Sequence, residues 1–530
     1  MTIFKSLLAG AAIGLAISTS PMAIAATPDN VLVVAMRIDD ITTLDPAESF
    51  EFAGGDVSRN VYMKLVNFDP TDLDAGYKPE IAESWTVSDD GTTITFKIKE
   101  GLSFHSGNPV TAEDVEFSLQ RAVLLNKTPS FILTQFGFDA DNVAETIKAE
   151  GDTVTLTTDQ PYATSFVLNC LTATIGGIVD KKTALTHEVD GDMGNEWLKT
   201  NSAGSGAYSV QAWNPSDSVV MTANPDYYRG TPAMTRVIIK HVQESASQRL
   251  QLERGDIDVA RNLNPEDVAG ISSVEGVKIV DELKGRLMYL SLNQQHPVLS
   301  KPKVREAFKY LIDYEGMTQS FLKGQYTVHQ NFLPQTYLGA SSENPFALNL
   351  EKAKALLEEA GVDGLELTVG VREAQERLEI AQSFQNNAAA AGIKINLTVG
   401  TGKQILGQYR ARELDVYLGA WGPDYPDPHT NAGTFAFNPD NSKEANATGL
   451  LAWRNGWDTA GLTEKTAAAV IENDRAVRAK LYDDIQAEFR ESSPFIVMAQ
   501  QIEQNAMNEK VTNFSGGQAI TSASYWQVTK

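Results

Sequence analysis

The chain has 530 residues, and its 68 aspartates and glutamates outnumber its 44 lysines and arginines, which gives a formal net charge of −24 at pH 7. So acidic a protein is poorly suited to nucleic acids, whose phosphates require basic partners, and is repelled by anionic lipid headgroups. The length exceeds what one hydrophobic core usually supports, so we expect two or three domains.

Residues 1–25 are typical of a secretory signal peptide. Lys5 precedes an apolar run over residues 7–17, and Ala23-Ile24-Ala25 has the small-x-small pattern of a cleavage site. The run is shorter than the about 20 apolar residues that cross a bilayer, and no cysteine stands at the cleavage site to carry a lipid. The sequence therefore predicts a soluble protein that is exported to the periplasm.

The single cysteine, Cys170, rules out an intramolecular disulfide. It lies in the apolar stretch 166–171, where a buried and inert thiol is favoured over a catalytic one. The six histidines lack the short spacings of a zinc site, and no nucleotide-binding or hydrolase motif is present. We therefore expect no metal, no cofactor and no enzymatic activity.

The first regular elements predict a small mixed domain. Residues 85–98 alternate apolar and polar side chains around an Asp-Gly turn at Asp90, which indicates a β-hairpin. Thr111 and Asp114 form a capping-box pattern that predicts a helix. A second hairpin is expected over residues 147–157, around Gly151.

Later patterns predict an α/β lobe. Residues 302–312 and 353–360 show the spacing of amphipathic helices. Strand, helix and strand patterns then follow each other over residues 365–369, 379–391 and 393–397. This alternation is the signature of a βαβ unit with parallel strands.

Several motifs recur along the chain in a characteristic order. The most specific is the block Phe104-His105-Ser106-Gly107-Asn108-Pro109-Val110-Thr111-Ala112-Glu113-Asp114-Val115. Others are Thr43-Leu44-Asp45-Pro46, Ala82-Glu83-Ser84-Trp85, Gly204-Ser205-Gly206-Ala207-Tyr208, Asn224-Pro225-Asp226-Tyr227-Tyr228, Val304-Arg305-Glu306-Ala307-Phe308 and Trp421-Gly422-Pro423-Asp424-Tyr425-Pro426-Asp427-Pro428. With these motifs the sequence resembles the extracellular solute-binding proteins of family 5, the oligopeptide and dipeptide type.

The resemblance implies an α/β, periplasmic binding protein-like fold of three domains, in which two lobes close by a hinge and one lobe carries an additional inserted mixed α/β domain. A discontinuous first lobe is expected from residues 26–65, 200–287 and 507–530. The inserted second domain is expected over 66–199, and the third, an α/β lobe, over 288–506.

The resemblance also implies the substrate-binding component of an ABC transporter that imports short peptides. Such a protein is expected to act as a monomer and to deliver its ligand to an inner-membrane permease with ATPase subunits. Opines, oligosaccharides and chelated metals are alternative ligands, because the same architecture serves them all. A hydrolase would need paired carboxylates, for which the spacing of the acidic residues gives no support. An adhesin would favour an anchor or repeats, and neither is visible.

A buried peptide needs partners for its ammonium and carboxylate groups. In the family, an aspartate three residues after a tryptophan receives the ammonium, and Asp424 stands at that place after Trp421. The alternative is that Asp424 only caps the local turn. For Asp427 the capping interpretation is preferred.

Arg372 is the expected partner of a ligand carboxylate, because dipeptide-binding relatives place an arginine there and its planar fork meets two oxygens at once. The family's proline-rich continuation is replaced by Glu373-Ala374-Gln375-Glu376, and Arg377 is a competing candidate. Trp421, Trp453 and Trp457 are candidates for stacking on a ligand or for the core. The resulting set of expected ligand-binding residues is Asp424, Trp421, Arg372, Tyr425 and Trp453.

Overall fold

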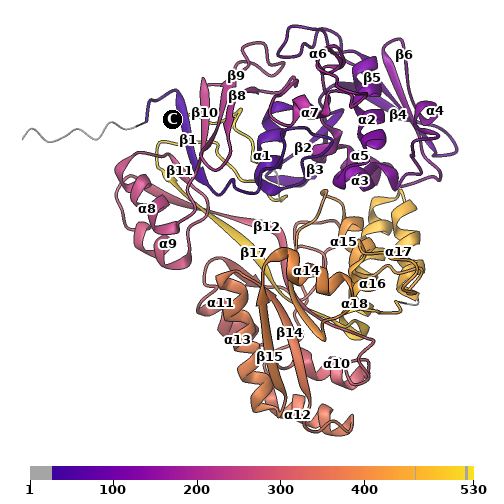
Figure 1. Ribbon diagram of the computed structural model, residues 1–530, viewed down its shortest axis with the longest axis vertical. Helices are drawn as coiled ribbons and strands as arrows, with labels where there is room; N and C mark the ends of the chain where they lie inside the picture. The colour runs from indigo at the N-terminus through magenta and orange to yellow at the C-terminus, as the bar shows by residue number, and fades with distance from the viewer. Residues whose placement is uncertain (1–26, 460, 520–522) are drawn as a thin grey trace, which may run out of the picture.

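The computed structural model describes residues 27–459, 461–519 and 523–530 and shows a mixed α/β protein with an upper and a lower lobe (Figure 1). The predicted signal peptide lies outside the described residues. Within the described part of the chain, no helix is long and apolar enough to span a bilayer.

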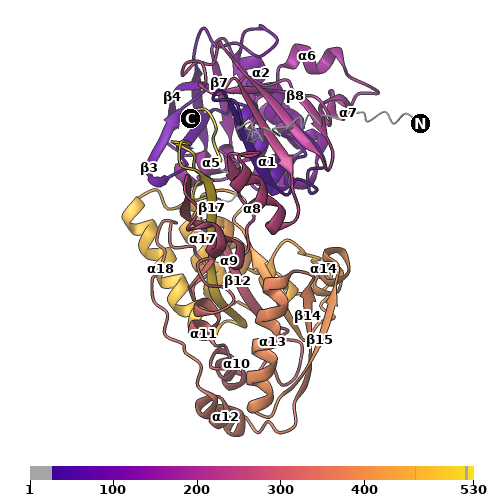
Figure 2. The same cartoon turned by 90° about the vertical axis from the view of Figure 1, so that its left-hand side faces the viewer.

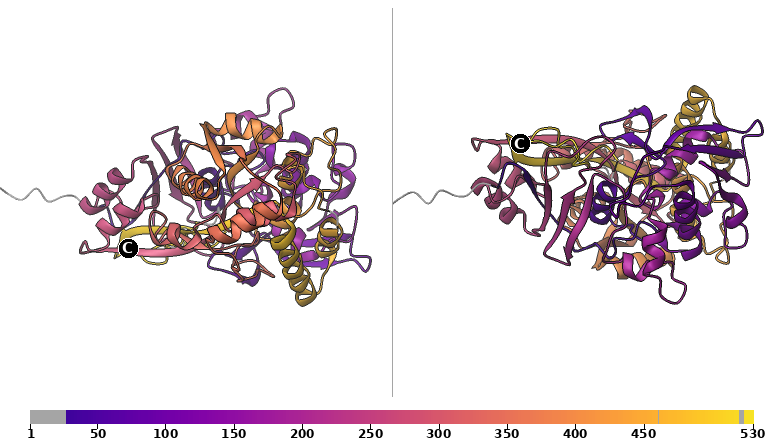
Figure 3. Two further views of the ribbon diagram at one scale, coloured as in Figure 1. Left: turned by 90° about the horizontal axis from the view of Figure 1, so that it is seen from below. Right: turned by 90° about the horizontal axis from the view of Figure 1, so that it is seen from above.

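One long sheet passes through both lobes. Its eleven strands in the described residues include the path β15-β14-β16-β12-β17-β11-β1-β10-β9-β8, and β13 pairs with β17. The strands β12 (Val277–Leu292) and β17 (Phe495–Asn508) are antiparallel and run side by side between the lobes (Figures 2 and 3). With 16 and 14 residues they each span on the order of 50 Å.

The β12–β17 ladder is interrupted where the strands leave one lobe for the other. Their register shifts between Leu283 and Leu287. Before the shift, β17 pairs with both β12 and β11 of the upper lobe, and from Leu287 onward β12 pairs with β16 of the lower lobe. An irregularity of this kind bends a strand locally, so it is the natural place for a hinge.

The upper lobe contains a second, four-stranded sheet of order β4-β5-β7-β6. The predicted hairpins are confirmed: β4 (Ala82–Val87) pairs with β5 (Thr93–Ile98), and β6 (Ile147–Glu150) pairs with β7 (Thr153–Thr157). Helix α2 (Ala112–Leu125) begins with the predicted capping box between Thr111 and Asp114.

The other elements of the upper lobe are its strands of the long sheet, the β2–β3 hairpin and the surrounding helices. They are β1 (Val31–Met36), α1 (Phe52–Val61), β2 (Val66–Asp69), β3 (Asp72–Pro79), η1 (Thr128–Ser130), α3 (Phe131–Thr134), α4 (Val143–Thr146), α5 (Thr164–Leu171), η2 (Thr174–Gly176), α6 (Lys181–Thr186), α7 (Asn195–Leu198), β8 (Tyr208–Asn214), β9 (Ser218–Ala223), β10 (Arg236–His241), α8 (Ser245–Arg254), β11 (Val259–Ala260) and α9 (Pro265–Ile271). Cys170 in α5 is fully buried, as predicted, and burial raises the pKa of its thiol.

The lower lobe contains the predicted βαβ unit. Strands β14 (Glu366–Arg372) and β15 (Lys394–Gly400) are parallel and are joined by α13 (Gln375–Ala390), and β16 (Val416–Trp421) is parallel to β14. The remaining elements are α10 (Pro302–Lys309), α11 (Tyr314–Gln319), β13 (Tyr326–Val328), α12 (Leu350–Glu359), α14 (Gly402–Arg410), α15 (Pro428–Phe435), α16 (Leu451–Arg454), α17 (Gly461–Ile471) and α18 (Arg475–Ser492). The three-domain division at the boundaries given above stays a prediction.

Candidate functional site

A pocket of about 220 Å³ lies between the two lobes. The lower lobe contributes the last residue of β16 and the loop that follows it, residues 421–424. The upper lobe contributes three segments around α1, α3 and η2, with the lining residues Phe50, Glu51, Phe52, Pro129, Ile132, Ala173, Thr174 and Ile175. A ligand in this pocket would contact both lobes at once.

Asp424 places a carboxylate in this pocket without a cationic partner. Its backbone N–H donates to the Thr430 hydroxyl at 3.1 Å, and no lysine or arginine of the described residues forms an ion pair with its side chain. Burial raises the pKa of the Asp424 carboxyl to about 7, and the contact with Thr430 opposes this only in part. Charging such a group in the empty pocket is costly, and a bound cation would relieve that cost.

The loop that carries Asp424 is held against the interrupted part of β12. A Cβ atom on Gly285 would stand only 3.1 Å from the ring of Pro423, so this close approach favours glycine. The indole N–H of Trp421 donates to Asn431 at 3.1 Å, and its ring packs edge-on against Phe435. The loop is therefore positioned by contacts on both sides of Asp424.

Glu51 is the second carboxylate that lines the pocket, and it comes from the opposite lobe. It accepts hydrogen bonds from the Thr42 hydroxyl at 2.8 Å and from the Phe50 backbone at 3.2 Å. The lining residues include no lysine or arginine. The pocket therefore favours a positively charged group.

Asp427, three residues after Asp424, has a different environment. It is fully buried, and it accepts two hydrogen bonds of 2.8 Å from Arg478 and one of 2.8 Å from the His429 backbone N–H. Burial works against its ionisation, but the Arg478 guanidinium keeps the pKa of Asp427 below its usual range. Asp427 is the N-cap of α15, which confirms the capping interpretation.

The lobes also touch each other away from β12 and β17, where α5 of the upper lobe lies above α15 and α17 of the lower lobe (Figure 1). Asn169 of α5 donates to Asp427 at 3.0 Å, and Arg478 donates to Ser165 at 3.1 Å. Tyr425 packs against Phe166, with ring centroids 5.9 Å apart. With the two strands on one side and this contact on the other, the lobes are in a closed arrangement.

Arg372 and Arg377 belong to one cationic cluster. Arg372 is the last residue of β14. This strand lies next to β16, and Val371 pairs with Leu418 in their parallel ladder. Arg377 is only 7% exposed, and burial followed by the nearby Arg286 lowers the pKa of its guanidinium. The Nε atoms of Arg372 and Arg377 are buried without a hydrogen-bond partner.

The cationic cluster holds more positive than negative charge. Arg286 forms an ion pair of 3.7 Å with Glu376, and Arg372 adds a further like charge near Arg377. Two of the three guanidinium groups, those of Arg372 and Arg377, thus have no ion pair among the residues that the structure describes. An anion would stabilise this cluster.

The other candidates lie apart from the pocket lining. Tyr425 is buried in the core of the upper lobe, although it belongs to the lower-lobe loop. Trp453 is buried under the Arg412 guanidinium, at 3.8 Å, and its indole N–H donates to the Ser442 carbonyl. Trp457 packs in the aromatic core of the lower lobe. Only Trp421 and Asp424 of the expected set line the pocket, and the ligand contacts expected of Arg372, Tyr425 and Trp453 stay a prediction.

Sequence reasoning missed the upper-lobe side of the pocket. Phe50 and Phe52 are 37% and 50% exposed, which is unusual for phenylalanine, and both line the pocket. In the sequence, this side of the pocket is indicated only by the two phenylalanines that flank Glu51 in a segment without clear periodicity. Arg286 was also missed, because it lies within a strand.

Comparisons with known proteins agree with the resemblance found in the sequence. Residues 76–443 match the family model described as bacterial extracellular solute-binding proteins, family 5 middle. The probable D,D-dipeptide-binding periplasmic protein DdpA of Escherichia coli is 28% identical over 502 residues, which is 93% of each chain. Among solved structures, HbpA2 from Haemophilus parasuis has a TM-score of 0.78 with 26% identity and covers 94% of this chain and 99% of its own. The DppA protein of Helicobacter pylori in complex with the peptide STSA has a TM-score of 0.78 with 23% identity, over 94% of this chain and 98% of its own.

Proposed function

The chain belongs to the bacterial extracellular solute-binding proteins of family 5, and from this premise we propose that it binds short peptides in the pocket between its lobes and delivers them to an ABC importer. In this proposal the protein acts in the periplasm after removal of residues 1–25, as a monomer, with an inner-membrane permease and its ATPase subunits as partners. It binds its ligand without changing it chemically.

The observation that carries the peptide assignment is the carboxylate of Asp424 in the interlobe pocket. It has no cationic partner in the described residues, and Glu51 lies across the pocket on the other lobe. A peptide α-ammonium placed between them would donate charge-assisted hydrogen bonds to carboxylates of both lobes. A neutral sugar could donate hydroxyl hydrogen bonds to the Asp424 carboxylate but would leave its charge without a counter-ion.

The cationic cluster of Arg286, Arg372 and Arg377 supports the other half of the proposal. A free peptide ends in a carboxylate, and Arg372 stands at the end of the strand next to the one that leads into the Asp424 loop. We propose Arg372 as the principal contact of that carboxylate, because Arg377 is more deeply buried. A short peptide would then be recognised by both of its charged ends.

Ligand binding is proposed to stabilise the closed arrangement. The upper and lower lobes are joined by β12 and β17, whose ladder is interrupted at residues 284–286. Contacts from both lobes to one ligand favour the closed state over an open one. Small-angle X-ray scattering should then show a smaller radius of gyration with saturating ligand than without it.

The deciding experiment is isothermal titration calorimetry with one short peptide in three forms: free, N-acetylated and C-amidated. The peptide is chosen from those that co-purify with the protein, identified by mass spectrometry. We expect both blocked forms to bind at least about tenfold more weakly, because each leaves one buried charge without its partner. Equal affinity for the free and N-acetylated forms would remove the role of Asp424. Co-purification of an opine would keep the transport role and change the ligand.

A further inference from the structure

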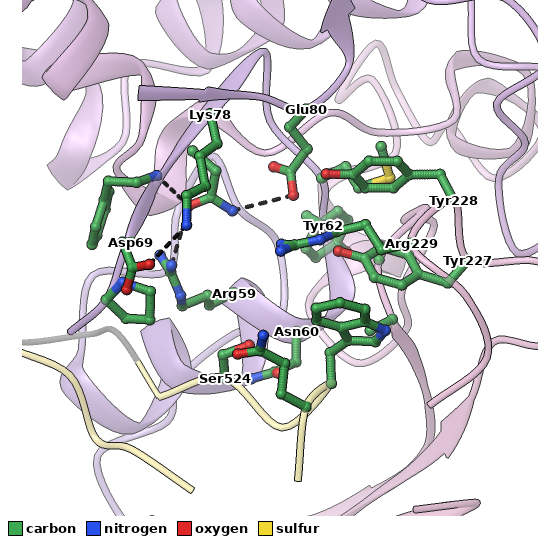
Figure 4. Close-up of a pocket in the computed structure, with 18 of the residues that line it drawn as sticks. Arg59, Asn60, Tyr62, Asp69, Lys78, Glu80, Tyr227, Tyr228, Arg229 and Ser524 are labelled. Atoms are coloured by element: carbon green, nitrogen blue, oxygen red, sulfur yellow. Dashed lines mark hydrogen bonds and ion pairs between the residues drawn. The ribbon is translucent and has the colours of Figure 1, made fainter. Parts of the chain in front are cut away.

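A second pocket, of about 280 Å³, lies entirely within the upper lobe (Figure 4). It is formed by the end of α1, the β2–β3 hairpin, the segment after β9, and residues 524–527 near the C-terminus. It shares no lining residue with the interlobe pocket. Closure of the lobes therefore does not assemble it.

The carboxylates of this second pocket already have partners. Asp69 forms an ion pair of 2.7 Å with Lys78, and this contact lowers the pKa of Asp69 to about 2. Glu80 accepts hydrogen bonds from the Lys64 backbone N–H at 2.8 Å and from the Asn67 amide at 3.1 Å. Neither carboxylate forms an ion pair with an arginine among the described residues, and the charge of Glu80 offsets the burial of Arg59 only in part.

Two guanidinium groups face the pocket without a carboxylate partner. Arg59 and Arg229 enter it from opposite sides in Figure 4 and form no ion pair with any of the residues that the structure describes. Arg59 donates to the Asn67 side chain at 3.1 Å and lies 4.6 Å from the ring centroid of Phe68, while its buried Nε has no hydrogen-bond partner. Burial lowers the pKa of Arg59, so its charge is held at a cost.

The charge of the pocket lining is opposite in sign to that of the whole chain. Three cationic side chains, Arg59, Lys78 and Arg229, face two carboxylates, so cations are in excess. The chain as a whole carries a formal charge of −24. A cationic hollow on so acidic a protein favours an anionic ligand, and the planar fork of arginine suits carboxylate and phosphate groups.

Aromatic rings form the wall beside Arg229. Its guanidinium lies 4.2 Å from the ring centroid of Trp526, and Tyr227 packs edge-on against both Tyr228 and Trp526. Such rings offer flat apolar faces with hydroxyl and N–H groups at their edges. A ligand with a planar body would fill the space next to the two arginines.

We propose that this upper-lobe pocket is a second binding site, which takes a small organic anion whose carboxylate or phosphate group lies between Arg59 and Arg229 and whose planar body packs against Tyr227, Tyr228 and Trp526. Because all of its groups belong to one lobe, the site binds its ligand in both the open and the closed arrangement. Occupancy neither requires nor blocks the interlobe pocket.

Ligand-observed NMR titrations with 4-hydroxybenzoate, 4-hydroxybenzyl alcohol and inorganic phosphate test the proposal. We expect 4-hydroxybenzoate to bind, and the neutral alcohol and phosphate to bind about tenfold more weakly, because each lacks one of the two recognised parts. Arg229→Gln should weaken 4-hydroxybenzoate binding about tenfold. The side chain is exposed, so this variant is expected to fold.

A matched variant acts as the control. Arg236→Gln removes an exposed arginine of β10, outside the lining of this pocket. It should bind 4-hydroxybenzoate as the parent does. The proposal is overturned if 4-hydroxybenzoate does not bind at millimolar concentration, if Arg229→Gln binds it unchanged, or if Arg236→Gln weakens binding as much as Arg229→Gln does. If inorganic phosphate binds as tightly as 4-hydroxybenzoate, the proposal that the site recognises a planar ligand body is wrong.

Discussion

Arg478 holds Asp427 with two parallel hydrogen bonds of 2.8 Å, and both side chains are almost completely excluded from solvent. Three residues earlier on the same loop, Asp424 faces the interlobe pocket without a cation. Two aspartates of one short motif thus have opposite environments. Asp427 is neutralised inside the protein by Arg478, whereas Asp424 is left for a ligand to neutralise.

Asp424→Asn is expected to weaken peptide binding by about tenfold to a few hundredfold. The amide is isosteric and keeps the loop, but it loses the charge-assisted contact with the ligand ammonium, worth roughly 1.5–3 kcal/mol. Calorimetry with a free peptide measures the change. Asp363→Asn, an exposed aspartate in the loop before β14, is the matched control and should bind like the parent. Unchanged affinity in Asp424→Asn would contradict ammonium recognition.

Peptide affinity should rise as the pH increases through about 7. The pKa of Asp424 in the empty pocket is raised by burial to about 7, and a bound ammonium lowers it, so binding releases a proton below that pH. The rise should end near pH 8, where the peptide α-amino group itself loses its proton. Calorimetry in buffers of different ionisation enthalpy detects the released proton. Asp424→Asn should release no proton when it binds the peptide. If proton release persists in this variant, the proton comes from another group.

Asp424→Asn should also make the ligand-free protein more stable at about pH 8. The folded-state pKa of Asp424 is raised above its unfolded value of 3.8, so the folded state binds the extra proton and its stability falls as the pH rises from about 4 to about 7. The asparagine variant avoids this loss. Thermal unfolding should show a higher Tm than the parent at about pH 8 and a much smaller difference at about pH 4. An equal difference at both pH values would show that ionisation is not the cause.

Arg372→Gln should weaken binding of the free peptide and leave binding of its C-amidated form unchanged. The guanidinium can pair only with a carboxylate, so its removal matters only when the ligand carries one. Calorimetry should show a loss of about tenfold for the free acid. Lys394→Gln, an exposed cation on the neighbouring strand β15, is the control. Equal losses for both ligand forms would point to a general change in the lobe.

Arg478→Met should destabilise the protein by about 3–5 kcal/mol, because it leaves the fully buried Asp427 carboxylate without its counter-ion. Thermal unfolding should show a clear fall in Tm. The double variant Asp427→Leu/Arg478→Met removes both charges and should recover much of this loss, although the N-cap of α15 is gone. A double variant that is less stable than Arg478→Met would mean that the cap and the Asn169 contact outweigh the buried charge.

Local patterns were sufficient to predict several elements. The hairpins around Gly91 and Gly151, the capping box at Thr111 and the βαβ unit from β14 to β15 all depend on residues close together in the chain. Turn chemistry and side-chain periodicity act over a few residues, so one sequence carries this information. The order of the motifs was also enough to indicate the family, which the comparisons confirm.

What the sequence determined about the pocket was one side of it, the loop with Trp421 and Asp424. The tertiary structure decided the other side, because Phe50 and Glu51 are brought to that loop across more than 300 residues of chain by β12 and β17. It also separated three tryptophans that looked equivalent: Trp421 lines the pocket, whereas Trp453 and Trp457 are buried elsewhere. An aromatic side chain fits a core and a ligand surface equally well, and only the packing of distant segments decides between them.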